Sequence, residues 1–268
     1  MAAVRAFAAW ATRTGRVRID DTLDLAAVQA PRSFGLRTPA FVSVEQLRLM
    51  DVAAGCAWLD DLLRAAQVRV ILRVLGGCGL RVAELAAARL QDVVPARPVV
   101  AIAVLAGRRV EGWQLDVIDG KGGRDRTVRM TPSARRAIEV LHGQLATSSL
   151  MLVPALSGHR SARALARGVA VRTVQATIMR LAQHANRATR TAHAGASTDD
   201  GLADVVPLGC AHPHALRHGY ALRYLSQDGT TLAGLSRALG HTAIATTARY
   251  LAAHEAALEP APSDPWTH

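Results

Sequence analysis

The C-terminal third of the chain carries side chains that together can act on a phosphate ester. His214 and Arg217 stand three residues apart. His241 comes later in the chain, and Tyr250 follows it by nine residues. A planar guanidinium binds two phosphate oxygens at once, an imidazole exchanges protons, and a phenol oxygen is a nucleophile when its developing charge is stabilised. These residue types in this order predict a site for phosphoryl transfer.

One predicted helix carries the first two of these side chains. Pro213 suits the first turn of a helix, and an apolar series continues to a stop signal at residues 227–229. His214, Arg217 and His218 share one face of this helix. The pattern therefore places a guanidinium between two imidazoles.

A second predicted helix leads to the remaining two side chains. Thr231 is suited to cap this helix, and Gly240 ends it as a left-handed residue. His241 then lies at the helix junction, and Tyr250 ends the short segment that follows.

The motifs formed by these residues resemble the C-terminal box of the tyrosine recombinase (phage integrase) family. GLRVAEL at residues 79–85 is similar to the first box of the same family. The resemblance implies that Arg81 is the first catalytic arginine and that Glu84 is a supporting acid. Three C-terminal motifs stand in the order and spacing of the family: H-x-x-R-H at residues 214–218, L-G-H at 239–241 and T-T-x-x-Y at 246–250.

The resemblance implies site-specific DNA recombination or integration by strand cleavage and rejoining. Tyr250 would attack a DNA phosphate and leave a 3′-phosphotyrosine and a free 5′-hydroxyl. A 5′-hydroxyl of another strand then reverses the step, so we expect no cofactor. The implied roles of the other residues are phosphate clamping by Arg81 and Arg217, removal of the phenol proton by His214, hydrogen bonding to the phosphate by His241 and protonation of the leaving oxygen by Lys121.

Lys121 is the single lysine among 32 basic residues. A guanidinium stays charged, whereas an ammonium can lose its proton when its surroundings lower its pKa. The solitary lysine in the turn at residues 119–123 therefore favours a role in proton donation, although chance survival of one lysine in a turn is the alternative.

Two other tyrosines compete with Tyr250 for the role of nucleophile. Tyr220 and Tyr224 follow Arg217 on the same predicted helix, by three and seven residues. We expect that helix to hold both rings rigidly in packing. Tyr250 lies on a separate terminal segment that can move, and it is the predicted nucleophile.

The charge of the chain favours a polyanionic partner. The formal net charge is +11 and the isoelectric point is about 11.1, and residues 140–198 contain no Asp or Glu. We expect double-stranded DNA as the partner, with self-assembly on DNA from dimer to tetramer and a partner recombinase or accessory DNA-binding protein as a further possibility. The arginines predicted to bind DNA are Arg160, Arg163, Arg167 and Arg172.

The fold class expected is mainly α with a small antiparallel β-sheet (α+β), the tyrosine recombinase/integrase catalytic-domain fold. A capping box at Ser43 begins the first of its helices. Residues 191–209 are predicted as a loop. The predicted helices span residues 43–55, 59–75, 132–145 and 172–186, and the predicted strands span 98–105, 112–118 and 127–130, the last two forming a hairpin.

The resemblance divides the chain into three parts. Residues 1–40 are expected to be a residual N-terminal helix and linker, 41–258 the catalytic domain and 259–268 a C-terminal tail. Family members usually carry a separate DNA-clamping domain before the catalytic one, so the short lead puts independent DNA binding in doubt.

Two alternatives stay open. A metal-dependent phosphodiesterase would use Cys210, His212, His214, His218 and His241, but Asp228 is the single acid between Gly209 and Ala253, so we expect no metal. The other alternative is a DNA-binding relative that has lost catalysis. The three cysteines predict no disulfide framework. No apolar segment is long enough for a membrane span, so we expect a cytoplasmic protein without a membrane partner.

Overall fold

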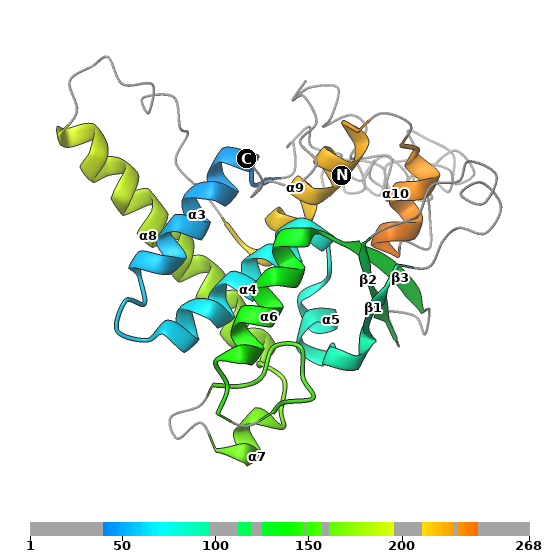
Figure 1. Ribbon diagram of the computed structural model, residues 1–268. Coiled ribbons are helices and arrows are strands. Elements are labelled where there is room, and N and C mark those ends of the chain that lie inside the picture. The colour runs from blue at the N-terminus through cyan, green and yellow to red at the C-terminus, as the bar shows by residue number, and fades with distance from the viewer. Residues whose placement is uncertain are drawn as a thin grey trace, which may run out of the picture. The chain divides into compact units, whose positions relative to one another are not determined.

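The described residues of the computed structural model form a mostly helical fold with one small sheet (Figure 1). This arrangement confirms the predicted fold class. Residues 40–96, 112–118, 125–146, 148–156, 161–195, 211–227 and 230–240 are described, all within the compact unit Pro39–His268. The expected N-terminal helix, the hairpin turn and the C-terminal tail lie outside these ranges.

Helix α4 (Leu62–Cys78) runs through the centre of the described fold, with α3 (Val44–Cys56), α6 (Pro132–Gly143) and α9 (Pro213–Leu225) packed around it (Figure 1). Asp61 caps its start by accepting a hydrogen bond from the Arg64 N–H (3.0 Å), and Gly79 ends it in the left-handed conformation (φ 66°). The helix is buried on most sides, as its apolar pattern predicts. The helix stop is Gly79, since Gly76 and Gly77 are helical.

The predicted capping box at Ser43 is confirmed, because Ser43 and Gln46 exchange side-chain to backbone hydrogen bonds at the start of α3. Helix α8 (Val171–Gly195) packs on α3, and its buried stripe includes Val174, Ile178 and Leu181. The loop predicted from residue 191 is wrong, since α8 continues to Gly195. No glycine or proline interrupts residues 187–194, which are rich in Ala and Arg, so helix propensity carries the chain onward.

The sheet has the order β1-β2-β3 and is antiparallel throughout. The predicted hairpin is confirmed by β2 (Trp113–Val117) and β3 (Arg126–Met130), which pair with Leu115 opposite Val128. Leu115, Val117, Val128 and Met130 turn to the core. Strand β1 (Val93–Pro95) was not predicted, and the strand predicted at 98–105 lies outside the described residues.

Helices α9 and α10 (Leu232–Leu239) begin and end where the sequence predicts. Pro213 stands in the first turn of α9, and Thr231 caps α10 by accepting a hydrogen bond from the Gly234 N–H (3.0 Å). Gly240 ends α10 with φ 63°. Helix α10 packs on α9 and against β3, so one edge of the sheet lies close to the last described helix of the chain (Figure 1).

The remaining described elements are short. They are α5 (Val82–Ala87), the 3-10 turn η1 (Leu90–Asp92) and α7 (Ala162–Leu165), which stands in the largely irregular segment between α6 and α8. Within the described ranges no helix combines the length and apolarity needed to cross a membrane.

Candidate active site

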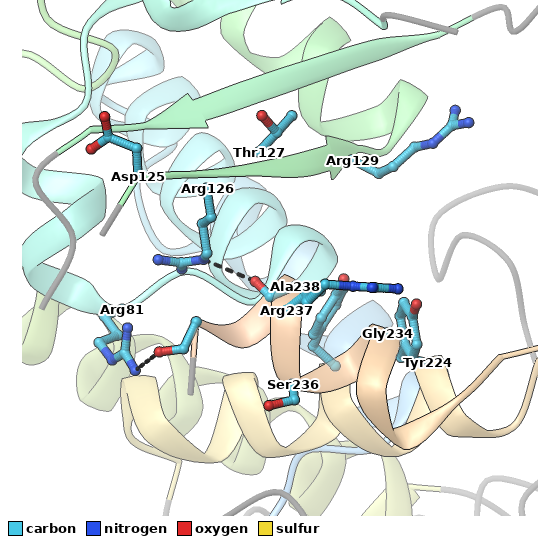
Figure 2. Close-up of a pocket in the computed structure, with 12 residues that line it drawn as sticks. Arg81, Asp125, Arg126, Thr127, Arg129, Tyr224, Gly234, Ser236, Arg237 and Ala238 are labelled. Carbon is cyan, nitrogen blue, oxygen red and sulfur yellow. Dashed lines mark hydrogen bonds between the residues drawn. The ribbon is translucent and has the colours of Figure 1, made fainter. Parts of the chain in front are cut away.

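Three arginines from distant parts of the chain donate hydrogen bonds to three consecutive carbonyls at the C-terminal end of α10. The last carbonyls of a helix have no partner within the helix and carry the negative end of its dipole, so they suit guanidinium donors. Figure 2 shows two of these contacts. The pairs are Arg126 Nε to Ala238 O (2.9 Å), Arg217 Nη2 to Leu239 O (2.5 Å) and Arg81 Nη2 to Gly240 O (3.1 Å).

Arg217 joins the ends of two helices. Its side chain is 1% exposed. Its Nη1 donates to the Gly79 carbonyl (2.6 Å) while Nη2 donates at the end of α10. Gly79 is required there, because it has φ 66° and a Cβ atom would overlap the ring of Tyr220. Arg217 therefore places a buried positive charge where the C-terminal ends of α4 and α10 meet.

Glu84 holds the guanidiniums of Arg81 and Arg126 together. It accepts hydrogen bonds from Arg81 N (2.7 Å) and Nη1 (2.8 Å), and from Arg126 Nη1 (2.8 Å) and Nη2 (2.7 Å). Burial alone would raise the pKa of Glu84, but the hydrogen bonds and charges of Arg126 and Arg81 outweigh it and lower the pKa to about 2. The carboxylate is therefore ionised and carries a full negative charge between the two guanidiniums.

One pocket brings together three of the predicted catalytic residues. Arg81 from the start of α5 and His214 and Arg217 from α9 line a cavity of about 600 Å³, which we call the arginine–histidine pocket. Gln175 and Met179 of α8 line the same pocket, and Met179 is 55% exposed. Arg81 precedes His214 and Arg217 by more than a hundred residues in the sequence, so it is the fold that brings the three side chains together.

A second cavity, of about 590 Å³, lies between β3 and α10, and we call it the β3–α10 pocket (Figure 2). Arg81 lines both pockets. Arg126 and Arg129 enter the second pocket from β3, and Arg237 enters it from α10. Guanidiniums thus surround the end of α10 on the sheet side as well.

The predicted helix face with two imidazoles is present at the start of α9. The ring centroids of His214 and His218 lie 4.6 Å apart. His214 is exposed, whereas burial and the nearby charge of His214 lower the pKa of His218 to about 4. His218 Nδ1 lies 3.1 Å from the Ala40 carbonyl, an acceptor that requires the proton on Nδ1. His218 is therefore a neutral structural group, and His214 is the imidazole that faces the pocket.

Tyr220 and Tyr224 are held in packing, as expected. Both rings lie against a small apolar cluster between α9 and α10, with centroids 6.2 Å apart. Burial raises the pKa of Tyr220 well above its usual value, which disfavours the phenolate that a nucleophile needs. Both tyrosines line the β3–α10 pocket, and neither lines the arginine–histidine pocket.

Several predicted site residues lie outside the described ranges. These are Lys121, His241, Tyr250 and the DNA-binding candidate Arg160. The three other DNA-binding candidates are exposed: Arg163 and Arg167 line a cavity of about 510 Å³ near the start of α8, and Arg172 stands in the first turn of that helix.

No three His, Cys, Asp or Glu side chains are grouped for metal binding among the described residues. The ring centroids of His212 and His214 lie 6.5 Å apart, and His212 Nδ1 accepts a hydrogen bond from the Ala215 N–H (3.1 Å) as the cap of α9. Cys210 and His241, the outer members of the set that the metal-dependent alternative would use, lie outside the described residues.

Arg126 is the site residue that the sequence analysis missed. Its side chain is 9% exposed, and it contacts both Glu84 and the end of α10. Strand periodicity contained the signal, because Arg126 shares the parity of the inward residues Val128 and Met130. The predicted strand began one residue too late, at Thr127, and so left Arg126 outside it.

The helical domain with its small antiparallel sheet brings arginines from distant segments together beside a histidine, an arrangement suited to binding a phosphate. The model of the phage integrase family matches residues 47–257. The tyrosine recombinase XerC of Mycobacterium tuberculosis strain H37Ra is 32% identical over 250 residues, which cover 92% of this chain and 69% of that protein. XerC of Mycobacterium sp. strain KMS is 30% identical over 249 residues, which cover 92% and 68%.

Solved structures show the same fold. The XerA recombinase matches with a TM-score of 0.50 at 20% identity, over 92% of this chain and 76% of that chain. The XerH site-specific recombinase, in a post-cleavage complex with palindromic difH substrate, matches with a TM-score of 0.57 at 16% identity, over 85% and 54%. The chain belongs to the phage integrase family, as its motifs predict, and is a tyrosine recombinase, an enzyme that breaks and rejoins DNA strands through a tyrosine.

Proposed function

We propose that this chain cleaves and rejoins duplex DNA at a specific site, with Tyr250 as the nucleophile and the scissile phosphate in the arginine–histidine pocket. The observation that carries the proposal is the shared lining of that pocket by Arg81, His214 and Arg217. These are the motif residues whose chemistry fits a phosphate: two fixed positive charges and one exposed imidazole.

The two arginines have different parts in this proposal. Arg81 is a quarter exposed and engages Glu84 and the Gly240 carbonyl, so further N–H groups of its five can reach a phosphate oxygen. Arg217 is buried and holds the ends of α4 and α10 while adding its charge to the pocket floor. A buried charge interacts strongly with the charge that develops on the phosphate in the transition state.

His214 and three residues outside the described ranges, Lys121, His241 and Tyr250, complete the proposed reaction. Tyr250 forms a bond to phosphorus as the bond to the 5′ oxygen breaks, which gives a 3′-phosphotyrosine and a 5′-hydroxyl. Lys121 donates a proton to that leaving oxygen, His214 assists removal of the phenol proton, and His241 hydrogen-bonds the phosphate. No cofactor is needed for rejoining, because the phosphodiester energy stays in the covalent intermediate.

DNA is the proposed partner, and two features support it. The chain has a net charge of +11, and Arg163, Arg167 and Arg172 are exposed on its surface. The related XerH structure is a complex with its difH substrate. We further propose assembly on DNA from dimer to tetramer, together with a second recombinase or an accessory DNA-binding protein.

The test is recovery of covalent protein–DNA adducts. The purified chain is incubated with nicked fragments of host chromosomal DNA, the mixture is denatured, and DNA bound to protein is sequenced. The expected result is an adduct at a defined sequence that survives excess EDTA, disappears in Tyr250→Phe and persists in Tyr220→Phe. An adduct that persists in Tyr250→Phe, or cleavage that requires a divalent metal, would overturn the assignment.

A further inference from the structure

Arg126 binds at both places where the Arg81 side chain is held, the Glu84 carboxylate and the C-terminal end of α10. Its Nη1 and Nη2 donate to both carboxylate oxygens of Glu84 at 2.8 and 2.7 Å, and its Nε donates to the Ala238 carbonyl at 2.9 Å. Arg81 in turn donates to Glu84 and to the Gly240 carbonyl, two residues beyond Ala238. Every hydrogen bond described for the Arg81 side chain therefore ends on a group that Arg126 also fixes directly or through the last turn of α10.

We propose that Arg126 is a positioning residue for the recombination reaction: it sets the guanidinium of Arg81 toward the scissile phosphate by holding Glu84. The inference rests on the proposed function, because it assigns Arg126 a part in the same site. Arg126 lines the β3–α10 pocket and does not line the arginine–histidine pocket, so it acts through Arg81 and makes no contact with the phosphate.

The geometry of an arginine is required for this role. A guanidinium offers a planar fork to the carboxylate and a separate Nε–H on its edge, and here the three donors meet three acceptors at 2.7–2.9 Å. The ammonium of a lysine is a point charge on a flexible stem and cannot reproduce that fork. Arg126→Lys therefore keeps the charge of the cluster and removes its geometry.

The charge balance explains why Glu84 needs a second arginine in order to position Arg81 without neutralising it. Glu84 is 7% exposed and is shared by Arg81, which is 25% exposed, and Arg126, which is 9% exposed. With both arginines present the cluster keeps one net positive charge for the phosphate. Without the second arginine, the carboxylate would turn entirely to Arg81 and neutralise it.

Arg129 provides a matched control. It lies two residues along the same strand, lines the same β3–α10 pocket and is exposed. Arg126→Lys and Arg129→Lys are compared with the unchanged chain in single-turnover adduct formation on the nicked site recovered above. Equilibrium DNA binding and thermal unfolding are measured in parallel. We expect Arg126→Lys to form adduct roughly 10- to 100-fold more slowly, the effect of a small misplacement of a catalytic group, and Arg129→Lys to stay within about three-fold.

A substrate with a methylphosphonate at the scissile position separates positioning from loss of structure. Its phosphorus centre carries no charge, so cleavage depends less on the guanidinium of Arg81. The Arg126→Lys defect should shrink to within about three-fold on this substrate, and a merely structural defect would not. The double variant Arg126→Lys with Glu84→Gln should be no slower than the slower single variant, because both act through one contact.

The outcomes separate the two proposals. If the unchanged chain forms no adduct, the proposed function fails. If it does, an unimpaired Arg126→Lys, or a defect of equal size on both substrates, overturns the positioning role. Should Arg126→Lys not fold, Glu84→Gln tests the same link from the other side with the same substrates, and the absence of a selective rescue there refutes the inference.

Discussion

The buried guanidinium of Arg217 makes a strong prediction about stability. Arg217→Met keeps an unbranched apolar side chain in place of the arginine stem and removes the donors to the carbonyls of Gly79 and Leu239. A buried carbonyl left without a partner costs about 1–3 kcal/mol. The substitution also removes the desolvation penalty of the buried guanidinium, and this stabilising change offsets part of the loss.

Two orphaned carbonyls less this relief give an expected loss of about 2–4 kcal/mol in the free energy of unfolding. Single domains are stable by about 5–15 kcal/mol, so the variant should still fold at room temperature. Urea unfolding followed by circular dichroism measures the loss, and Arg172→Met, at an exposed position of α8, serves as the control with an expected change under about 0.5 kcal/mol.

A loss below about 1 kcal/mol for Arg217→Met would refute the reasoning, since it would mean that the two carbonyls find other partners at little cost. The size of the loss also bears on activity assays. An Arg217 variant without activity is informative about catalysis only at temperatures where most of it is folded. Arg81→Met, which removes a quarter-exposed side chain, should lose activity with a smaller loss of stability.

Three further predictions concern the surrounding groups. Gly240→Ala should lower the free energy of unfolding by about 1–2 kcal/mol in urea titrations, because Gly240 has φ 63° and a Cβ atom would lie 3.0 Å from Arg126 Cδ. Burial lowers the pKa of His218 to about 4 from the usual 6.5 of histidine. The folded chain therefore binds fewer protons than the unfolded chain between these pH values, and it loses stability as the pH falls through them. His218→Asn should flatten that slope in thermal scans, by about 1 kcal/mol after allowance for partial exposure, while leaving the separate loss below pH 4.5 from Glu84. Lys121→Arg should slow cleavage by roughly 10² to 10⁴ on ordinary DNA and recover on DNA with sulfur as the 5′ bridging atom, because a thiolate leaves without a proton; equal loss on both substrates would contradict proton donation.

Local signals in the sequence predicted most of the helix boundaries. The capping box at Ser43, Pro213 in the first turn of α9, and Thr231 and Gly240 at the ends of α10 all act within about four residues of the chain. Signals of this kind are readable without the fold. The end of α8 was missed because the chain there carries no local stop before Gly195, and only the helix propensity of each residue decides its length.

Features that depend on distant partners were not predicted. Strand β1 has three residues and exists because Val93 and Val94 pair with Leu115 and Gln114 of β2. So short a segment has no periodicity to detect. For Arg126, strand parity indicates that the side chain turns inward, but its partners Glu84 and the end of α10 lie far away in the sequence.

The motifs identified Arg81 and Arg217 but gave no indication of what those arginines hold before DNA arrives. Both donate to carbonyls at the end of α10, and Arg217 also donates at the end of α4. Helix ends carry partial negative charge, so their carbonyls order the guanidiniums as an anion would. A site whose positive groups are already ordered does not have to reorganise when charge develops on a phosphate, which is the condition for strong electrostatic stabilisation of a transition state. The same contacts fix Leu239 and Gly240, so the groups proposed to bind the phosphate also hold the last described turn of α10 in place.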